Sequence, residues 1–430
     1  MSLNLFLLLA AYYVIKPVRE ALILVDPRGA EYKSYMSAVI GVGLLFAVPA
    51  YSAFAKRVPR NRVVVTVTLF FASNLVAFYF VGLFYRDQLW LGLLFYFWVG
   101  IFNMMVVAKL WALANDLYTD EQGARLFPLI GVGASAGSVG GSIYGIVTRG
   151  TDLFVMLLAA AFTLVVVAGL SQLVHRREIR RDAEKTAAAK SPSDAKVPPV
   201  PPDGGGAFEL VWKTPYLVLI AAFTVLFTLV NTNGEFMIGS LVYEWASGLD
   251  AAGLLPAGMD TGQTIKAWFD DFYLWVNGVG LVLQLFVVSR LVKYGGIKVA
   301  FFVLPVIALI DATLVGLFPL LLILRYGKIA DNSLDYSLNN TVRNMLWLPT
   351  TTEMKYRAKQ AIDSFFVRMG DVGSAIFVFV MANQLGLGVR AFAAANAVMI
   401  VGWIFVAVLI LRLRKSLLAE RGRGAQNADP

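Results

Sequence analysis

The sequence predicts an all-α membrane protein of about twelve transmembrane helices, arranged as two six-helix halves. The composition, the length of the apolar segments and a polar stretch in the middle of the chain support this prediction. Of the 430 residues, 58% are hydrophobic and 15% are charged, whereas soluble proteins carry about 25% charged residues. A helix crosses the bilayer with roughly 20 apolar residues. Because lipid cannot satisfy backbone polar groups, segments of that length must be helical.

The residue types that are missing exclude several kinds of site. The chain has no cysteine and one histidine, His175, which excludes disulfides, zinc–thiolate centres, iron–sulfur clusters and thiol catalysis. We therefore expect no catalytic residues, no metal site and no cofactor. The chain carries a net charge of +9. Its charged residues lie between apolar segments, so they indicate membrane topology and no nucleic-acid partner.

Twelve apolar segments can be read along the chain. They cover residues 3–25, 34–54, 63–84, 89–114, 126–147, 153–174, 216–237, 268–292, 297–318, 320–346, 361–382 and 391–411. The first segment continues through Lys16 and Arg19 without a small-residue cleavage site, so it does not read as a signal peptide.

The distribution of lysine and arginine predicts the orientation. With the N-terminus inside, the inside loops, linker and tail hold 24 of these residues, and the outside loops hold six: Arg28, Lys33, Arg86, Arg149, Lys266 and Arg390. Positive charge accumulates on the cytoplasmic side. We therefore expect both termini in the cytoplasm and a bacterial inner-membrane location.

A polar linker divides the chain into an N-terminal half (1–174) and a C-terminal half (214–412), followed by a tail (413–430). The linker (175–213) begins with a charged stretch that can extend a helix into the cytoplasm, and its proline- and glycine-rich middle reads as a flexible tether. Trp111, Gly137 and Ser138 recur 236 residues later as Trp347, Gly373 and Ser374. Six spans, a linker and six spans with matching landmarks predict the parallel repeat of major facilitator carriers.

Ionisable residues within spans are costly and usually face a cavity or a partner. In the first span, Lys16, Arg19 and Glu20 share one face, next to Pro17, which we expect to break the helix. We favour an anion-facing site there over an internal Lys16–Glu20 pair.

The fourth and seventh spans also carry polar side chains. The fourth has Lys109 and Asn115 near its end, and the seventh ends in a polar run that includes Asn231 and Glu235. Lys109 can also snorkel to the interface. Glu235 is expected to pair with a basic residue of the other half when the site is empty.

The tenth span has the strongest pattern. Arg325, Lys328, Asn332, Asp335, Asn339 and Arg343 follow one another at intervals of three or four residues. This spacing predicts one polar stripe along a helix that lines a water-filled cavity.

Glycines four residues apart mark the fifth span. Gly133, Gly137 and Gly141 form a small-residue stripe that allows close helix packing. The segment is not a dinucleotide-binding motif, because no strand precedes it.

Three stretches make the chain resemble the ATP/ADP translocases of intracellular bacteria and plastids: residues 125–134, 335–349 and 355–363. The first is similar to that family's signature after its fourth span, and the others are similar to its tenth-span pattern and the basic segment after it. Residues 15–24 also fit the first-span pattern, which places Arg19 where the family has a functional lysine.

The resemblance implies a nucleotide carrier. Glu235 falls near a functional glutamate of the family, whereas Lys109 stands where the family has a glutamate and Asp335 where it has a lysine. Both reversals of charge can change which substrate charge the carrier prefers. No Walker A pattern occurs, so the nucleotide would be cargo.

Together these features predict a monomeric carrier, not an enzyme, that exchanges an anionic ATP/ADP-type nucleotide by alternating access. The expected substrate-binding residues are Lys16, Arg19, Lys109, Asn115, Asn231, Glu235, Asp335, Asn339, Arg343, Lys355 and Lys359. The alternatives are a proton-coupled carrier of another small anion and a membrane-embedded transferase. A transferase would have only carboxylates for its chemistry. A membrane scaffold would gain nothing from the charged stripe.

Overall fold

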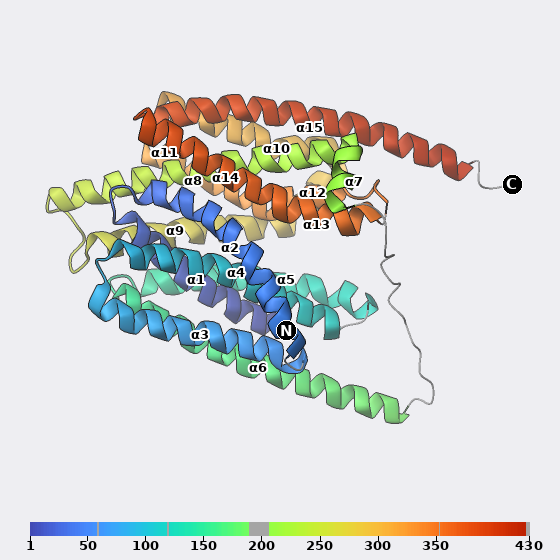
Figure 1. Cartoon of the computed structure of the whole chain (residues 1–430), viewed down its shortest axis with the longest axis horizontal. Helices are drawn as coiled ribbons and strands as arrows, with labels where there is room; N and C mark the ends of the chain where they lie inside the picture. The colour runs from blue at the N-terminus through green and yellow to red at the C-terminus, as the bar shows by residue number, and fades with distance from the viewer. Residues whose placement is uncertain (58–59, 118–119, 189–205, 352, 427–430) are drawn as a thin grey trace. The chain divides into compact units, whose positions relative to one another are not determined.

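The computed structural model describes the backbone of residues 1–57, 60–117, 120–188, 206–351 and 353–426. It describes the side chains of all residues except 48–52, 54–62, 107–128, 175–205, 352, 356 and 419–430. Within these ranges every regular element is helical, as predicted (Figure 1). The chain clusters into two units. The first contains Met1–Leu22, Val42–Gly204 and Phe269–Asp271, and the second contains Ile23–Gly41, Gly205–Trp268 and Phe272–Pro430.

The helices before the linker follow the predicted segments. They are α1 (Ser2–Leu24), α2 (Gly29–Arg57), α3 (Arg60–Tyr85), α4 (Leu89–Leu117), α5 (Asp120–Val147) and α6 (Leu153–Ala188). The charged start of the predicted linker does extend a helix, because α6 continues past His175 to Ala188. The proline- and glycine-rich middle lies outside the described residues, apart from Gly206.

The helices after the linker are more interrupted. The α-helices are α7 (Ala207–Lys213), α8 (Pro215–Ala251), α9 (Thr261–Val282), α10 (Val288–Leu317), α11 (Leu321–Leu334), α12 (Asn340–Met345), α13 (Lys359–Ala361), α14 (Val367–Val378) and α15 (Val389–Gln426). Between them are π-helical segments η1 (Leu283–Val287), η2 (Asp335–Asn339), η3 (Met354–Ala358), η4 (Ile362–Phe366) and η5 (Phe379–Gln384). Segments of this type often mark functional sites within α-helices.

Pro17 does not break the first helix. The helix α1 runs without interruption from Ser2 to Leu24 with Pro17 inside it, so the predicted break is wrong. Prolines are tolerated in membrane helices because neighbouring helices and side chains satisfy the freed backbone groups.

In the first unit, the glycine stripe of α5 packs against α1, as its spacing predicts. A Cβ at Gly133, Gly137 or Gly141 would collide with backbone oxygens of Ser2, Phe6 and Ala10, respectively. These three partners are themselves four residues apart, so the two helices contact along matching turns. The helices α3 and α6 also lie along each other (Figure 1).

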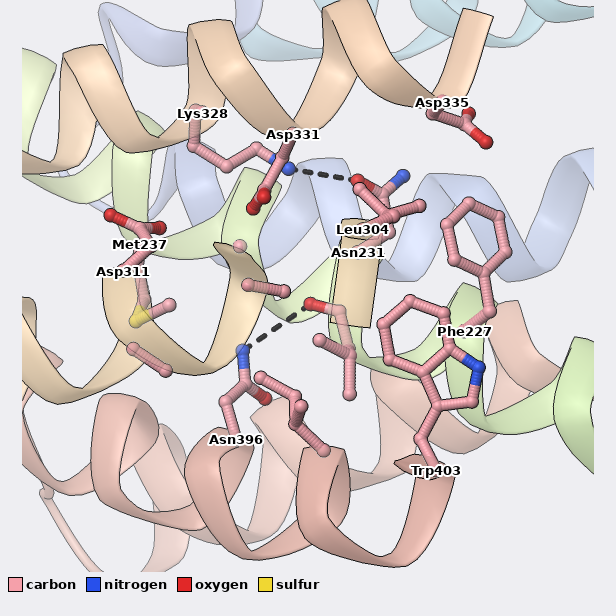
Figure 2. Close-up of a pocket in the computed structure, with 15 residues that line it drawn as sticks. Phe227, Asn231, Met237, Leu304, Asp311, Lys328, Asp331, Asp335, Asn396 and Trp403 are labelled. Atoms are coloured by element: carbon pink, nitrogen blue, oxygen red, sulfur yellow. Dashed lines mark hydrogen bonds between the residues drawn. The ribbon is translucent and has the colours of Figure 1, made fainter. Parts of the chain in front are cut away.

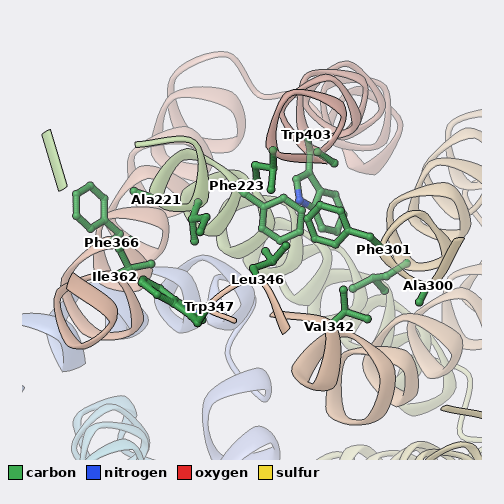
Figure 3. Close-up of a cluster of buried hydrophobic side chains, with 14 of the residues drawn as sticks. Ala221, Phe223, Ala300, Phe301, Val342, Leu346, Trp347, Ile362, Phe366 and Trp403 are labelled. Carbon is green, nitrogen blue, oxygen red and sulfur yellow. The ribbon is translucent and has the colours of Figure 1, made fainter. Parts of the chain in front are cut away.

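The second unit repeats this arrangement. There α10 lies along α15 and α14 lies along α8, which are the counterparts of α3 with α6 and of α5 with α1. Its apolar core includes Phe223, whose ring stacks on Phe301 at 4.8 Å between centroids and contacts Trp403 at 5.3 Å (Figure 3). The packing therefore supports the parallel repeat that the recurring tryptophan, glycine and serine predict.

Apolar side chains also cover the outside of the helices. Eight stretches in the described part of the chain are long and apolar enough to span a membrane, and Thr261–Leu317, one of them, covers two predicted segments. Large apolar residues such as Phe46, Phe162 and Val398 are more than 70% exposed. Such exposure fits a surface covered by lipid.

Two lysines that the sequence assigned to outside loops are instead buried in helices. Lys33 lies in α2 and is 4% exposed, and Lys266 lies in α9 and is 3% exposed. The loops are shorter than predicted, because α2 begins at Gly29 and α9 begins at Thr261 with an Asp260 capping box. A capping box satisfies free backbone groups and allows a helix to begin within polar sequence.

Candidate functional site

A polar cavity lies within the second unit, between α8, α10, α11 and α15 (Figure 2). Its volume is about 30 Å³, which is room for one or two water molecules. The apolar side of its wall includes Phe227 and Trp403. Its polar lining residues are Asn231, Asp311, Lys328, Asp331, Asp335 and Asn396.

Lys328 is the buried cation of this cavity. Its side chain is 2% exposed, its Nζ donates a hydrogen bond to Asn231 Oδ1 at 2.8 Å, and it lies 3.6 Å from Glu235 Oε1. Asn231 and Glu235 are one turn apart on α8, so both face the lysine. Gly234 makes room for it, since a Cβ there would lie 3.1 Å from Lys328 Nζ.

Glu235 joins three helices. Its Oε2 accepts a hydrogen bond from Lys33 Nζ of α2 at 3.0 Å, and its Oε1 accepts one from Asn332 Nδ2 of α11 at 3.4 Å. The expectation that Glu235 pairs with a basic residue of the other half is confirmed by Lys33, and Lys328 of its own half is a second basic neighbour. We call Lys33, Asn231, Glu235, Lys328 and Asn332 the Glu235 network.

Three aspartates add negative charge to the cavity. Asp335 accepts a hydrogen bond from Asn339 Nδ2 at 2.7 Å. Asp311 of α10 and Asp331 of α11 each have a buried Oδ1 without a hydrogen-bond partner. Among the side chains that the structure describes, no group of three or more His, Cys, Asp or Glu residues could hold a metal ion.

A second polar layer ties α8 to α14 and α15. Asn233 donates to Asn396 Oδ1 at 3.0 Å and accepts from Ser374 Oγ at 2.7 Å. Thr232 Oγ1 donates to Asp371 Oδ1 at 3.2 Å, and Arg368 donates to Asp371 Oδ2 at 2.7 Å. These buried groups satisfy one another, which rigidifies the wall beside the cavity.

The predicted stripe of the tenth span holds only in part. Lys328, Asn332, Asp335 and Asn339 belong to the cavity or to its hydrogen bonds, but Arg325 lies over the Trp268 ring. Arg343 instead pairs with Asp363 at 3.2 Å. The Arg343 guanidinium also lies 5.8 Å from the centre of the Phe227 ring, which lines the cavity.

Two predicted lysines also lie apart from the cavity lining. Lys359 Nζ donates to Asn344 Oδ1 at 2.8 Å, and Lys355 is exposed in η3. The structure therefore brings together Asn231, Glu235, Asp335 and Asn339, and it places Arg343 beside Phe227 of the cavity wall. It does not bring Lys355 or Lys359 to them.

In the first unit, the predicted site residues of α1 contact aromatic rings. Lys16 Nζ lies 5.2 Å from the centre of the Tyr13 ring, and the Arg19 guanidinium lies 4.4 Å from that of Tyr96. Arg19 also donates to Glu20 through Nε at 3.1 Å, so the glutamate pairs with its sequence neighbour. Lys109 and Asn115 lie in α4, but their side chains are outside the described residues.

The expected substrate-binding residues did not include Lys33, Lys328, Asp311, Asp331 and Asn396, although Lys328 belonged to the predicted stripe and both aspartates lie within predicted spans. A single charged residue in an otherwise apolar span, such as Asp311, was the available signal. No sequence pattern indicated that Lys33 meets Glu235, because the two residues are 202 positions apart.

Comparison with known proteins supports a transporter. The model of the TLC ATP/ADP transporter family matches residues 261–416. ADP,ATP carrier protein 1 of Chlamydia pneumoniae is 21% identical over 370 residues, which cover 76% of this chain and 68% of the relative. The protein of the same name from Chlamydia trachomatis is 20% identical over 352 residues, covering 72% and 63%. This chain thus spans about two thirds of the relatives' length.

Solved structures share the fold. The nucleoside transporter NupG superposes with a TM-score of 0.62 at 13% identity, covering 96% of this chain and 98% of NupG. The human organic anion transporter MFSD10 gives 0.55 at 14% identity, covering 94% and 97%. At such identities the likeness concerns the fold alone, which is that of major facilitator transporters. The chain therefore shares its fold with these solved transporters, has helices long and apolar enough to span a membrane, and matches the model of the TLC ATP/ADP transporter family over residues 261–416.

Proposed function

We propose that this chain exchanges an anionic nucleotide of the ATP/ADP type across the bacterial inner membrane by alternating access. The family match and the names of the relatives support the substrate class. The single structural observation that carries the proposal is the Glu235 network, in which one carboxylate holds two buried lysines, Lys33 and Lys328.

Such a network is suited to exchange of ionic partners. Burying charges in a membrane helix is costly unless they are paired. Phosphate oxygens accept hydrogen bonds from ammonium groups as a carboxylate does. An anionic substrate can therefore replace Glu235 as the partner of Lys328 without leaving the lysine unpaired, and Glu235 would retain Lys33.

The size of the cavity supports a carrier with more than one conformation. A space of about 30 Å³ admits water, whereas ligand pockets measure roughly 300–1,000 Å³. Binding of a nucleotide at Lys328 therefore requires the surrounding helices to move apart. The π-segment η2 and Gly296 (φ 69°), which interrupts α10, are places where these helices depart from regular geometry.

The remaining contacts are assigned by the chemistry of the side chains. Lys16, Arg19 and Lys109 suit phosphate oxygens by charge, and Arg343 can bind phosphate with its guanidinium fork once released from Asp363. Asn115, Asn231 and Asn339 suit base or ribose groups. We further propose that both termini are cytoplasmic and that the carrier acts as a monomer.

Counterflow in proteoliposomes tests this function. Vesicles holding purified protein and loaded with unlabelled ADP should accumulate labelled ATP, and empty vesicles should not. Lys328→Gln should abolish this exchange, because an amide cannot replace the charge that faces phosphate. The matched control, Lys293→Gln, changes an exposed lysine and should exchange like the unmodified protein. Equal counterflow in the Lys328 variant, or no counterflow with any nucleotide, would overturn the proposal.

A further inference from the structure

The short helix α7 has one buried face and one exposed aromatic face. Val211 is fully buried, whereas Phe208 and Trp212, four residues apart on one side of the helix, are exposed. One residue separates Lys213 from Pro215, where the apolar span of α8 begins. Tryptophan is enriched at the level of the lipid headgroups, because its ring is apolar and its N–H can stay hydrated. The aromatic face of α7 therefore lies at the interface between lipid and water.

The helix α15 reaches the same interface near its end. Its apolar stretch begins at Val389, and Arg414 lies about 38 Å further along the helix, which is beyond the roughly 30 Å of the hydrocarbon layer. Arg414 is close enough to Tyr216, near the start of α8, for an electrostatic interaction. Leu413 packs against the apolar core that contains Val211 of α7. The basic end of α15 and the aromatic helix α7 therefore belong to one surface of the second unit.

Basic side chains outnumber carboxylates where α7, η3, α13 and α15 meet. Three carboxylates there are each paired with a cation: Glu209 with Lys213, Glu353 with Arg357 and Asp363 with Arg343. Residues 389–418 contain no Asp or Glu. Among the side chains that the structure describes, five further cations have no carboxylate within ion-pair distance: Lys355, Lys359, Arg412, Arg414 and Lys415. This end of the second unit thus carries uncompensated positive charge beside the membrane.

Arg414 has a hydrogen-bond donor that no described residue satisfies. Its Nε is buried without a partner, and the neighbouring Arg412 and Lys415 are exposed. A guanidinium can hold phosphate oxygens through two parallel hydrogen bonds. Each basic residue near an anionic membrane surface strengthens binding about fivefold. A zwitterionic headgroup carries its own ammonium group and would leave the charge of this surface uncompensated, so the complementary lipid is an anionic one.

We propose that the surface formed by Trp212, Arg412, Arg414 and Lys415 binds the headgroup of an anionic phospholipid. Arg414 holds the phosphate, the two neighbouring cations match the negative charge, and Trp212 lies beside the upper part of the acyl chains. The bound lipid links the end of α15 to α7 and stabilises the folded second unit, because a ligand of the folded state raises its stability by mass action. This binding does not depend on the identity of the transported cargo.

Thermal unfolding in detergent, without nucleotide, tests the site. Phosphatidylglycerol should raise the unfolding midpoint, and phosphatidylcholine should not. Arg414→Gln should raise the phosphatidylglycerol concentration needed for half of the shift about fivefold, and the triple variant Arg412→Gln/Arg414→Gln/Lys415→Gln should raise it on the order of 100-fold. The matched control, Arg390→Gln, removes an exposed charge at the other end of α15 and should respond like the unmodified protein. Each variant is compared with its own midpoint without lipid, so a less stable variant remains informative.

Two further arms identify the source of the bound phosphate. Inorganic phosphate should not reproduce the shift, because it lacks the acyl chains that remain beside Trp212. High salt should reduce the shift, since salt screens interactions between exposed charges. An equal shift with phosphatidylcholine or with inorganic phosphate, or equal responses of Arg414→Gln and Arg390→Gln, would each overturn the lipid site. A normal lipid response in protein that exchanges no nucleotide would support the lipid site and overturn only the proposed cargo.

Discussion

Removing the negative charge of Glu235 should destabilise the protein more than removing one of its lysines. In Glu235→Gln, Lys33 loses its carboxylate partner while remaining buried, with its side chain 5% exposed, whereas Lys328 keeps the neighbouring aspartates of the cavity. Breaking a buried pair by removing one partner costs about 3–5 kcal/mol, because an uncompensated charge remains. Lys33→Met is milder, because Glu235 retains Lys328 at 3.6 Å and Asn332 at 3.4 Å.

A double variant tests whether Lys33 and Glu235 are energetically coupled. In Lys33→Met/Glu235→Gln, Lys328 is the remaining cation of the Glu235 network, and it keeps its hydrogen bond to Asn231 at 2.8 Å and the neighbouring aspartates of the cavity. Coupling between contacting residues amounts to about 0.5–3 kcal/mol. The double variant should therefore be more stable than Glu235→Gln alone, although it carries one more substitution.

Thermal unfolding in one detergent at one pH gives the order of the four proteins. We expect the midpoint to fall from the unmodified protein to Lys33→Met, then to the double variant, with Glu235→Gln lowest. Glu353→Gln is the control, since Glu353 is 54% exposed and pairs with Arg357 at the surface, where such pairs contribute about 0–1 kcal/mol. Additive losses, which place the double variant lowest, would refute the ion pairing described here.

Three further outcomes are expected. Gly137→Val should lower the free energy of unfolding by about 1–3 kcal/mol through overpacking against α1. The control Gly131→Ala, whose Cβ would meet no atom within 4 Å, should not. Equal unfolding midpoints for the two variants would contradict the close packing of α5. Arg19→Gln should weaken binding of a nucleoside triphosphate about ten- to 150-fold in a titration, which corresponds to the loss of a hydrogen bond to a charged group. The control Arg390→Gln, at an exposed position, should keep the affinity. Unchanged affinity in Arg19→Gln would remove Arg19 from the site. A cysteine placed at Ser193 of this cysteine-free chain should resist an impermeant thiol reagent in intact cells, and labelling would reverse the proposed orientation.

The segments that cross the membrane were predictable because apolar length is a local property of the sequence. The glycine stripe of α5 belongs to the same class, since a four-residue repeat fixes one face of one helix. Its contact with α1 confirms what the spacing indicated. The tenth-span stripe also placed Lys328, Asn332 and Asp335 on one face, as α-helical periodicity requires.

Departures from regular helices were not predictable from spacing. Pro17 remains inside a continuous helix, as membrane helices allow when neighbouring groups satisfy the backbone. The π-segment η2 (Asp335–Asn339) interrupts the helix before Arg343, which pairs with Asp363 and lies over the Phe227 ring. In each case the packing of neighbouring helices outweighs the local preference of the chain.

The sequence by itself determined the class of protein, the helical spans and the polar character of the seventh and tenth spans, because hydrophobicity and helical periodicity act over neighbouring residues. Only the tertiary structure decided which charges meet. Lys33 reaches Glu235 across 202 positions of the chain, and Asp311 shares a cavity with Asp331 only because α10 packs against α11 at Gly327. Pairing of buried charges depends on distances between helices, which no local pattern encodes.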